Sequence, residues 1–164
     1  MTTRAATRIF ALAGFIALAA CSPGDSDPDA SVARPGNPFF GTWKTATAQV
    51  APWWTAPGAP PQMDPEFQNT PIVFAAGKSS GPAIVACKAP IYAVDFTRPR
   101  ALFEGHLQDP ARDAAALGFT SEDITKMNLS CTDDNRDVSL DFPMVDDDTI
   151  LLGLDNMIYT LKRQ

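Results

Sequence analysis

Short runs of β-branched and aromatic residues follow one another through much of the chain, and turn-forming residues separate them. Val, Ile, Thr, Tyr and Phe favour strands, whereas Gly, Pro, Asn and Asp favour turns. A spacing of about ten residues between such runs is typical of an antiparallel barrel or sandwich. Asp155 and Asn156, which tolerate positive φ, predict a hairpin turn between the last two runs. The pattern predicts strands over residues 72–76, 83–87, 91–96, 101–107, 124–131, 137–145, 149–154 and 157–162.

A first strand and one helix complete the expected fold. Residues 39–50 are rich in Thr, Val and aromatic side chains and contain no helix-start pattern. Asp109 suits a helix N-cap, Pro110 suits the first helical position, and Gly118 is a natural terminator. We therefore expect an all-β fold of about nine strands with one short helix, arranged as a small antiparallel barrel or sandwich. It forms a single domain over residues 38–164.

The segment between the first two expected strands, residues 51–71, contains six prolines. Proline fixes φ and lacks an N–H donor, so this density excludes a regular helix or a central strand. We interpret the segment as a long, semi-rigid loop, and such loops are usually lids or binding loops. Trp53 and Trp54 are its candidate contacts with a ligand or partner. The alternative is that both fold back and plug the end of the barrel, whereas Trp43 is expected in the core.

The N-terminus has the pattern of an export signal. Arg4 and Arg8 precede an uninterrupted apolar run over residues 9–20. A bilayer-spanning helix needs about 20 apolar residues, so this run instead fits a removable secretory signal over residues 1–20. Residues 22–37 lack aromatic side chains and are rich in Pro, Gly, Ser and Asp. They predict a flexible tether ahead of the folded body.

The end of the apolar run, Leu-Ala-Ala-Cys over residues 18–21, resembles the lipobox of bacterial lipoproteins. The resemblance implies cleavage before Cys21 and acylation of that cysteine, which would anchor the protein to a membrane through its N-terminal lipid. Ser22 stands where many lipoproteins carry a sorting signal, and it is not the aspartate that commonly retains them at the inner membrane. The resemblance thus implies the periplasmic face of the outer membrane. The alternative is an ordinary secretory signal with a chance cysteine at position 21.

Charge and cysteine content agree with an exported protein. Without residues 1–20 the chain carries 11 Lys and Arg and 19 Asp and Glu, which argues against a nucleic-acid partner. Once Cys21 is acylated, Cys87 and Cys131 remain as one pair, and we predict a structural disulfide. Closing such a loop contributes about 4 kcal/mol in the chain-entropy model. The alternatives are two unrelated buried thiols or a redox or metal site, which neither a CxxC spacing nor a His-rich neighbourhood supports.

The sequence Gly-Lys-Ser-Ser-Gly around Ser79 matches GxSxG, and Asp95 and His106 follow in the order of an α/β-hydrolase triad. That elbow must lead into a helix, yet residues 82–86 resemble another strand. We expect a hairpin turn around Ser79 and no catalytic residues, with a small serine hydrolase as a further alternative. The Gly-Lys-Ser within this sequence is not a P-loop, because Ile72 stands where the first glycine is needed.

His106 is the one histidine of the chain. In an extended run it would share a face with Glu104 and Gln108 and form a small polar site. General acid–base chemistry and zinc binding both need more partners than these. We therefore expect a surface histidine or one with a structural hydrogen bond.

Acidic residues gather at 133–137 and at 146–148. The first cluster has oxygen-bearing side chains at alternate positions, as at the start of a calcium loop: Asp133, Asn135 and Asp137. An EF-hand needs glycine at its sixth position and glutamate at its twelfth, where this chain has Val138 and Met144. We expect solvated turns, no metal site and no cofactor.

Two short stretches resemble the lipocalin or calycin family: Gly-Thr-Trp at residues 41–43, and the last expected strand with its basic end at residues 158–163. The resemblance implies a barrel in which Trp43 packs at the closed end beneath Arg163 or Lys162. It also implies that the long loop after the first strand covers part of the open end. Its two adjacent tryptophans would then lie on the lid.

The chain also resembles the META-domain envelope lipoproteins, which begin with a Gly-x-Trp strand and carry a cysteine after a glycine-containing turn. Residues 81–87 are the matching stretch here. Both resemblances imply a small exported β fold, and neither transfers an activity, since function depends on sites rather than folds.

The expected function is a lipid-anchored, non-enzymatic binding module for a small apolar ligand or an envelope component. The alternative is a protein-interaction or inhibitor module that acts through exposed loops. A ligand binder should have a continuous apolar cavity beneath Trp53 and Trp54. An interaction module should instead have a filled barrel and an exposed aromatic patch.

Overall fold

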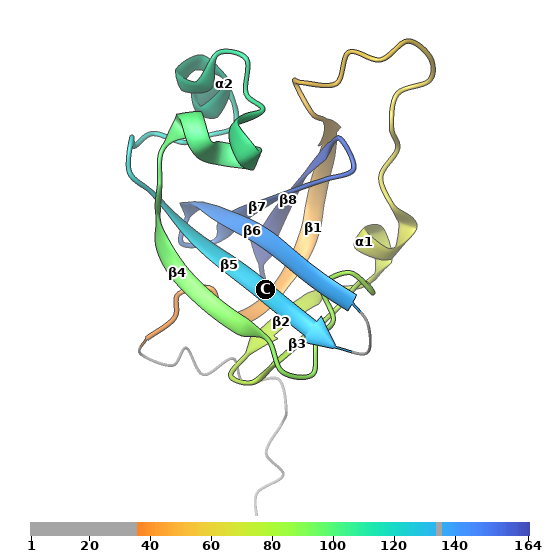
Figure 1. Cartoon of the computed structure of the whole chain (residues 1–164), viewed down its shortest axis with the longest axis vertical. Coiled ribbons are helices and arrows are strands. Elements are labelled where there is room, and N and C mark those ends of the chain that lie inside the picture. Colours follow the sequence, from red (N-terminus) through yellow and green to blue (C-terminus); the bar gives the residue numbers. More distant parts are fainter. Residues whose placement is uncertain (1–35, 134–135) are drawn as a thin grey trace, which may run out of the picture. The chain divides into compact units, whose positions relative to one another are not determined.

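The computed structural model describes residues 36–133 and 136–164, which form one antiparallel sheet curled into a half-barrel (Figure 1). The expected signal sequence, Cys21 and most of the tether lie outside the described residues. The strand order is β3-β2-β1-β8-β7-β6-β5-β4. The strands are β1 (Gly41–Val50), β2 (Ile72–Ala75), β3 (Lys78–Ser80), β4 (Ile91–Thr97), β5 (Ile124–Asp133), β6 (Arg136–Asp146), β7 (Thr149–Leu154) and β8 (Met157–Arg163). The prediction of an all-β antiparallel fold is confirmed.

The inside of the half-barrel is packed with apolar side chains. Alternation along each strand places one set of side chains inward, as Ile150 and Leu152 of β7 show. Every strand except β3 and β4 contributes fully buried members to this main core, and Val85 and Cys87 add to it from the segment after β3. Its largest members are Trp43, Tyr159, Phe39, Phe67, Phe74, Phe142, Ile72, Met127 and Leu129. The enclosed space is therefore a filled core.

Trp43 is a fully buried member of this core and lies beneath Arg163. Its ring is fully buried, its Nε1 donates to the Phe39 carbonyl at 2.8 Å, and the Arg163 guanidinium carbon lies 4.1 Å from the ring centre. Arg163 also donates to the carbonyl oxygens of Pro38 and Phe40. The core position of Trp43 is confirmed. The lipocalin resemblance implied that Arg163 or Lys162 lies above Trp43, and in the structure this residue is Arg163.

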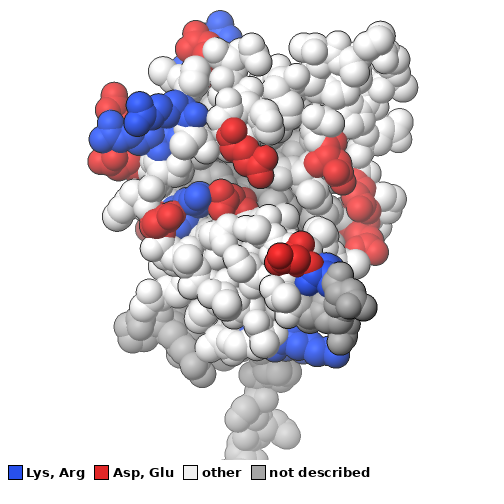
Figure 2. All heavy atoms as spheres, in the orientation of Figure 1, with Lys and Arg blue, Asp and Glu red and all other residues white. Residues whose placement is uncertain are grey.

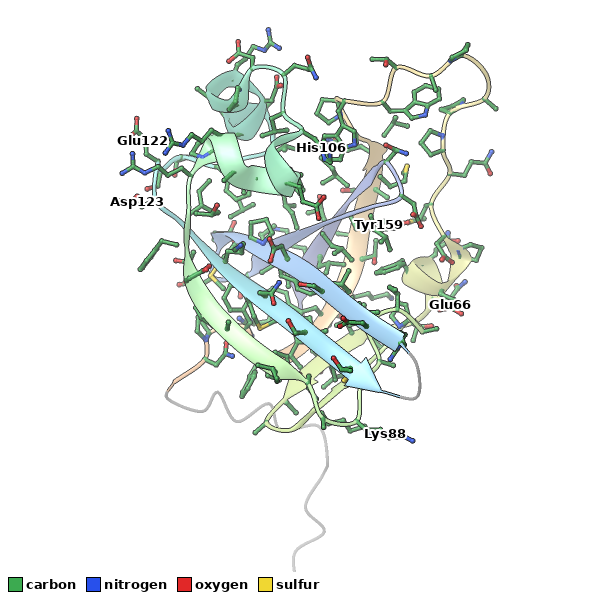
Figure 3. All side chains as sticks on the ribbon, viewed as in Figure 1. Glu66, Lys88, His106, Glu122, Asp123 and Tyr159 are labelled. Atoms are coloured by element: carbon green, nitrogen blue, oxygen red, sulfur yellow. A yellow bond between two sulfur atoms is a disulfide. The ribbon has the colours of Figure 1, made fainter. Side chains whose placement is uncertain are left out.

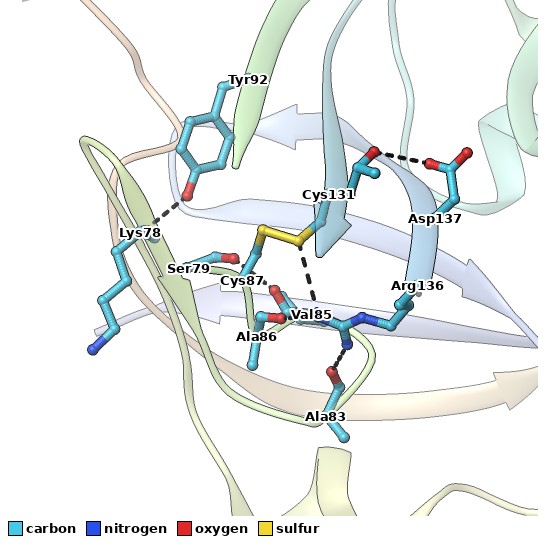
Figure 4. The surroundings of a disulfide bond; sticks show 11 residues. Lys78, Ser79, Ala83, Val85, Ala86, Cys87, Tyr92, Cys131, Arg136 and Asp137 are labelled. Carbon is cyan, nitrogen blue, oxygen red and sulfur yellow. Dashed lines mark hydrogen bonds between the residues drawn. A yellow bond between two sulfur atoms is a disulfide. The ribbon is translucent and has the colours of Figure 1, made fainter. Parts of the chain in front are cut away.

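The predicted disulfide between Cys87 and Cys131 is present (Figure 4). It joins the segment after β3 to β5, with the two Cα atoms 6.0 Å apart. Cys87 also exchanges two main-chain hydrogen bonds of 3.0 Å with Ser79 of β3. The β3 edge of the sheet is thus held by covalent and main-chain bonds.

The prediction of a strand over residues 83–87 is wrong. Val85 and Ala86 donate their amide hydrogens to the Pro82 carbonyl, so this segment is a turn, and Cys87 alone forms a bridge to a strand. Gly81 begins the turn with φ of +142°, which is why a β-prone composition does not extend here. The expected turn around Ser79 is also wrong in part, because Ser79 lies within β3.

The prediction of a strand over residues 101–107 is wrong as well. Pro99–Gly105 forms a kinked 3₁₀ segment, η1. Pro99 suits a helix start, and Phe103, Glu104 and Gly105 have φ of 49°, 59° and 80°, which no strand contains. Two expected strands are thus absent and β3 was not expected, so the sheet has eight strands instead of about nine.

Two short α-helices lie outside the sheet. The predicted helix is confirmed as α2 (Pro110–Ala116), with the Asp109 carboxylate accepting from the Arg112 amide at 3.4 Å. The second helix, α1 (Pro65–Asn69), corrects the expectation that proline excludes helix throughout the loop after β1. Pro65 stands at a helix start, where proline's missing donor costs nothing, and the Asp64 side chain caps it.

A second, smaller apolar cluster covers the opposite face of β7 and β8. Leu151 and Ile158 point away from the main core and pack with side chains from η1, α2, the residues that follow each of them, the residue after β1 and the start of β5. These partners are Ala51, Leu102, Leu107, Ala114, Phe119 and Ile124. The β7–β8 hairpin is therefore buried on both faces. Its turn at Asp155 and Asn156 has φ of 50° and 61°, which confirms the predicted hairpin.

Candidate functional site

A cleft lies where β6 separates from β7. The two strands pair only at Met144 with Ile150 and at Asp146 with Thr149, and the register shifts between these pairs. Pro143, which precedes Met144, has no N–H to donate, and proline within strands is confined to edges and bulges. No ladder pair joins residues 136–143 to β7. The paired strands β3, β2, β1, β8 and β7 thus end at β7, where pairing to β6 is mostly lost. The cleft begins at this side of β7.

The cleft has a volume of about 420 Å³ and is open on one side, which is within the usual size range of small-molecule sites. Segments far apart in the sequence line it: β5, β6, the β7–β8 hairpin, the η1 segment and the loop after β1. Figure 2 shows acidic side chains around a hollow on this face. The lining residues are Trp53, Phe103, Glu104, His106, Asn128, Ser139, Leu140, Asp141, Gly153, Leu154, Asp155 and Asn156.

Aromatic rings form one wall of the cleft. The centre of the Trp53 ring lies 5.4 Å from that of Phe103 and 5.6 Å from that of His106. The indole Nε1 of Trp53 donates to the Asn156 side chain at 3.2 Å, which ties the loop after β1 to the β7–β8 turn. Figure 3 shows His106 between the 3₁₀ segment and that loop. The tryptophan ring is therefore held in place by contacts on several segments.

Gly153 makes this wall possible. A Cβ atom at this position would lie 2.6 Å from Cδ1 of Phe103, which is closer than nonbonded atoms approach. The missing side chain lets the Phe103 ring lie against β7, and Trp53 then packs on Phe103. Phe103 reaches this position from a backbone with φ of 49°, a conformation that is uncommon outside glycine. A glycine in a strand often marks such a close approach.

Carboxylates give the cleft its charge. Glu104, Asp141 and Asp155 line it, and none of its lining residues is Lys or Arg. Asp141 is paired with Lys126 at 3.0 Å and also accepts from the Asn128 amide at 2.9 Å. The carboxylates of Glu104 and Asp155 have no hydrogen bond or ion pair with any other described residue. Two of the three negative charges are therefore available to a ligand.

The structure separates the two adjacent tryptophans. Trp53 lines the cleft, whereas Trp54 is half-buried outside the lining and its amide donates to the Ala51 carbonyl at 3.0 Å. Neither plugs the main core, because the cluster that Trp53 contacts lies on the opposite face of the sheet. Only Trp53 is thus in a position to touch a ligand in this cleft.

The hydrolase-like residues are not assembled as a triad. Ser79 is 2 % exposed, and its hydroxyl donates to the Val85 carbonyl at 2.6 Å rather than to a base. Asp95 lies exposed on β4. His106 lines the cleft, whose lining includes neither of the other two. The Ser79 hydroxyl holds the turn after β3 in place.

The expected polar site on an extended run through Glu104, His106 and Gln108 is wrong in its geometry, because this run is not a strand. Glu104 and His106 nevertheless meet in the cleft, while Gln108 is not part of the lining. The imidazole of His106 makes no hydrogen bond to another described residue. Its ring contact with Trp53 is the interaction that places it.

The second acidic cluster forms the turn between β6 and β7, as expected. The Asp148 amide donates to the Asp146 carboxylate at 2.9 Å. A hydrogen bond from the Thr149 side chain, together with this amide, holds the pKa of Asp146 below its ordinary value. In the first cluster, Asn135 lies outside the described residues. Within 36–133 and 136–164, no group of three or more His, Cys, Asp or Glu side chains is placed to hold a metal ion.

The sequence did not reveal most of the cleft. Phe103 and Gly153 have a role only because η1 lies on β7, and Asn128 and Asp141 resemble ordinary solvent-facing positions of strands. Two signals were present: a glycine inside the apolar run of β7, and a proline inside β6. Each marks an irregularity in a strand, but neither identifies what lies opposite.

Comparison with known proteins assigns no relationship: no protein-family model matches the chain, and neither curated proteins nor solved structures give a match. In the part of the chain that the structure describes, no helix has the length and apolar character needed to cross a membrane.

Proposed function

We propose that this protein is a lipid-anchored, non-enzymatic binding module of the cell envelope, and that it holds a small organic ligand in the cleft beside Trp53. One observation carries the proposal: a cleft of about 420 Å³ with an aromatic wall opens next to β7, while the half-barrel itself is filled by its core. The ligand site therefore lies between β6 and η1. The proposed site is this cleft and not a cavity inside the half-barrel, which its core fills.

The lining suits binding. Trp53 and Phe103 offer apolar ring surface, while Asn128, Ser139 and Asn156 offer amide and hydroxyl groups that orient a ligand. Nucleophilic catalysis would need a nucleophile and base in hydrogen-bond contact. The Ser139 hydroxyl instead accepts from the Asn128 amide at 2.9 Å. This arrangement supports a binding role over a hydrolytic one.

Nuclear magnetic resonance of the three indole N–H groups tests the ligand site. The sample is the chain from residue 21 onward with Cys21→Ser, so that no acyl chain competes for an apolar probe. Titration with 2-naphthylmethanol should shift the Trp53 indole resonance and leave that of Trp54 in place, with Trp53→Phe and Trp54→Phe assigning the two. Equal shifts at both tryptophans, or none at Trp53, would refute the proposed site.

The anchor rests on the pattern of residues 4–21 and is tested separately. We propose acylation of Cys21 and attachment to the periplasmic face of the outer membrane. Metabolic labelling with a radioactive fatty acid should mark the wild-type chain and not Cys21→Ala. Density-gradient separation of the two membranes then locates the labelled protein. An unlabelled wild-type chain, or one recovered unprocessed from the cell interior, would contradict this proposal.

A second candidate function, interaction with another protein, is favoured by β4. This strand is at one edge of the sheet, and the large apolar side chains of the described residues that are exposed, Ile91, Val94 and Phe96, all lie on it. Its edge, unpaired among the described residues, fits an extended segment of a partner that adds a strand, with Val94 and Phe96 on one face of β4 and Ile91 on the other to receive its side chains. Phe96→Lys should abolish such an interaction in a pull-down from envelope extract and leave the Trp53 titration unchanged.

A further inference from the structure

We propose that the ligand of the cleft is an organic cation, such as an amine with a flat apolar body, held by Glu104, Asp155 and the ring of Trp53. This inference rests on the proposed binding function and specifies the chemical class of the ligand. It depends on the signs of the charges around the cleft and on the chemistry of its aromatic wall.

The charges favour a positive ligand over a negative one. Three carboxylates and no Lys or Arg are among the lining residues. Lys126 balances Asp141, which leaves Glu104 and Asp155 without a charge partner among the described residues. These two carboxylates come from different segments, η1 and the β7–β8 turn. Both residues are exposed, so water and salt screen their charges in part, and an anion in the cleft would still meet two uncompensated negative charges.

The aromatic wall adds a second recognition element. The face of an indole attracts cations more strongly than any other side-chain ring. Trp53 is fixed by its bond to Asn156 and its contact with Phe103. Elsewhere in the fold the chain places its own cation, Arg163, over Trp43. Among the described residues no Lys or Arg lies over Trp53, whose ring contacts Phe103 and His106, so a ligand cation would supply that charge at the part of the ring that these two leave open.

The same features disfavour other ligand classes. A bare metal ion needs three or more closely grouped ligands, and no such group exists among the described side chains. A purely apolar molecule would gain nothing from Glu104 and Asp155 and would displace part of the water around these two exposed carboxylates. An ammonium group next to an aromatic or aliphatic body satisfies both the carboxylates and the rings.

The test uses three probes that share one ring system and differ in charge: 2-naphthylmethylammonium, 2-naphthylmethanol and 2-naphthoate. Each is titrated at neutral pH into the chain from residue 21 onward with Cys21→Ser, and the Trp53 indole resonance is followed. We expect the ammonium probe to bind roughly tenfold more tightly than the alcohol, and the carboxylate probe to bind most weakly. Added salt should reduce the difference.

Two variants locate the effect. Glu104→Gln and Asp155→Asn should each weaken binding of the ammonium probe by roughly threefold to tenfold, and by clearly more than they weaken binding of the alcohol. Asp95→Asn is the matched control, because Asp95 is an exposed carboxylate on β4 outside the cleft. It should alter neither titration.

The outcomes separate this inference from the proposed function. If the alcohol and the ammonium probe shift Trp53 with equal affinity, the binding site stands and the charge preference is overturned. Tighter binding of the carboxylate probe overturns it as well. If no probe shifts Trp53, the proposed function fails and the inference fails with it.

Discussion

Strands β4 and β8 have the same length and nearly the same character in sequence, yet their surroundings are opposite. Each has seven residues rich in Ile, Tyr, Thr and other strand formers. In β8, Ile158 is fully buried and faces the outer cluster, while Tyr159 faces the main core. In β4, Ile91 is 71 % exposed and Phe96 is 74 % exposed. A strand's composition thus indicates that it is a strand, and not what covers its faces.

The outer face of β8 is covered in part by residues 101–107, which we had predicted to form a strand. Leu102 and Leu107 have the apolar character of strand residues, and they are apolar because they pack on the outer face of β7 and β8. A buried 3₁₀ segment and a buried strand require the same kind of side chain. Local propensity therefore does not distinguish them when tertiary contacts provide the burial.

The largest expected effect comes from Ile158→Ala. This side chain is fully buried in the outer cluster, and truncation of a buried isoleucine leaves a cavity that costs about 2–5 kcal/mol. Urea denaturation followed by circular dichroism measures the loss in the free energy of unfolding. A loss below about 1 kcal/mol would mean that the outer cluster adds little to the stability of β8, and the contrast with β4 would lose its physical basis.

Gly153→Ala tests the comparison of covered and exposed strands more finely, because a single added methyl group disturbs the packing of Phe103 on β7. The added Cβ meets the Phe103 ring at 2.6 Å, and such overpacking costs about 1–3 kcal/mol. We expect the free energy of unfolding to fall and the Trp53 indole resonance to move, since Trp53 packs on Phe103.

The double variant Gly153→Ala with Phe103→Ala provides the control. Removal of the ring removes the clash, so the glycine substitution should cost much less in this background than in the wild type. Equal costs in the two backgrounds would show that Gly153 matters for its backbone and not for its contact with Phe103.

The sequence predicted the elements whose determinants are local. Asp109, Pro110 and Gly118 mark α2, and Asp155 and Asn156 mark the last hairpin, because caps and turns depend on residues a few positions apart. The disulfide followed from a count of the cysteines left after Cys21. All of these predictions required no knowledge of which strands are neighbours.

The cleft could not be predicted, because it depends on contacts between distant segments. It requires β6 to leave β7, η1 to lie on β7, and Trp53 to reach Asn156 across 103 positions of sequence. Trp53 was identified as a candidate from its loop, whereas His106 and Glu104 were considered together only on an assumed strand that does not exist, and His106 was expected to be a surface or structural residue. The charge of the site emerged only when these residues were placed together with Asp155.

A smaller effect is expected from Asp109→Ala, which removes the N-cap of α2. Loss of such a cap costs about 1 kcal/mol, and α2 contributes Ala114 to the cover of β7 and β8. Hydrogen exchange should increase in α2 first, with β8 protected as before. Faster exchange throughout β8 would contradict the prediction and show that the helix and the hairpin open as one unit.

The smallest effect is expected from Phe96→Ala, which tests the other side of the comparison. This phenylalanine has the same side chain as Phe39, Phe74 and Phe142 of the core, but it is 74 % exposed on an edge strand. Its truncation should change the free energy of unfolding by less than about 0.5 kcal/mol, measured by the same urea titration as Ile158→Ala. A loss above about 1 kcal/mol would show that the side chain is covered in solution. Both strands would then be buried: β8 by the outer cluster of the described fold, and β4 by something outside it.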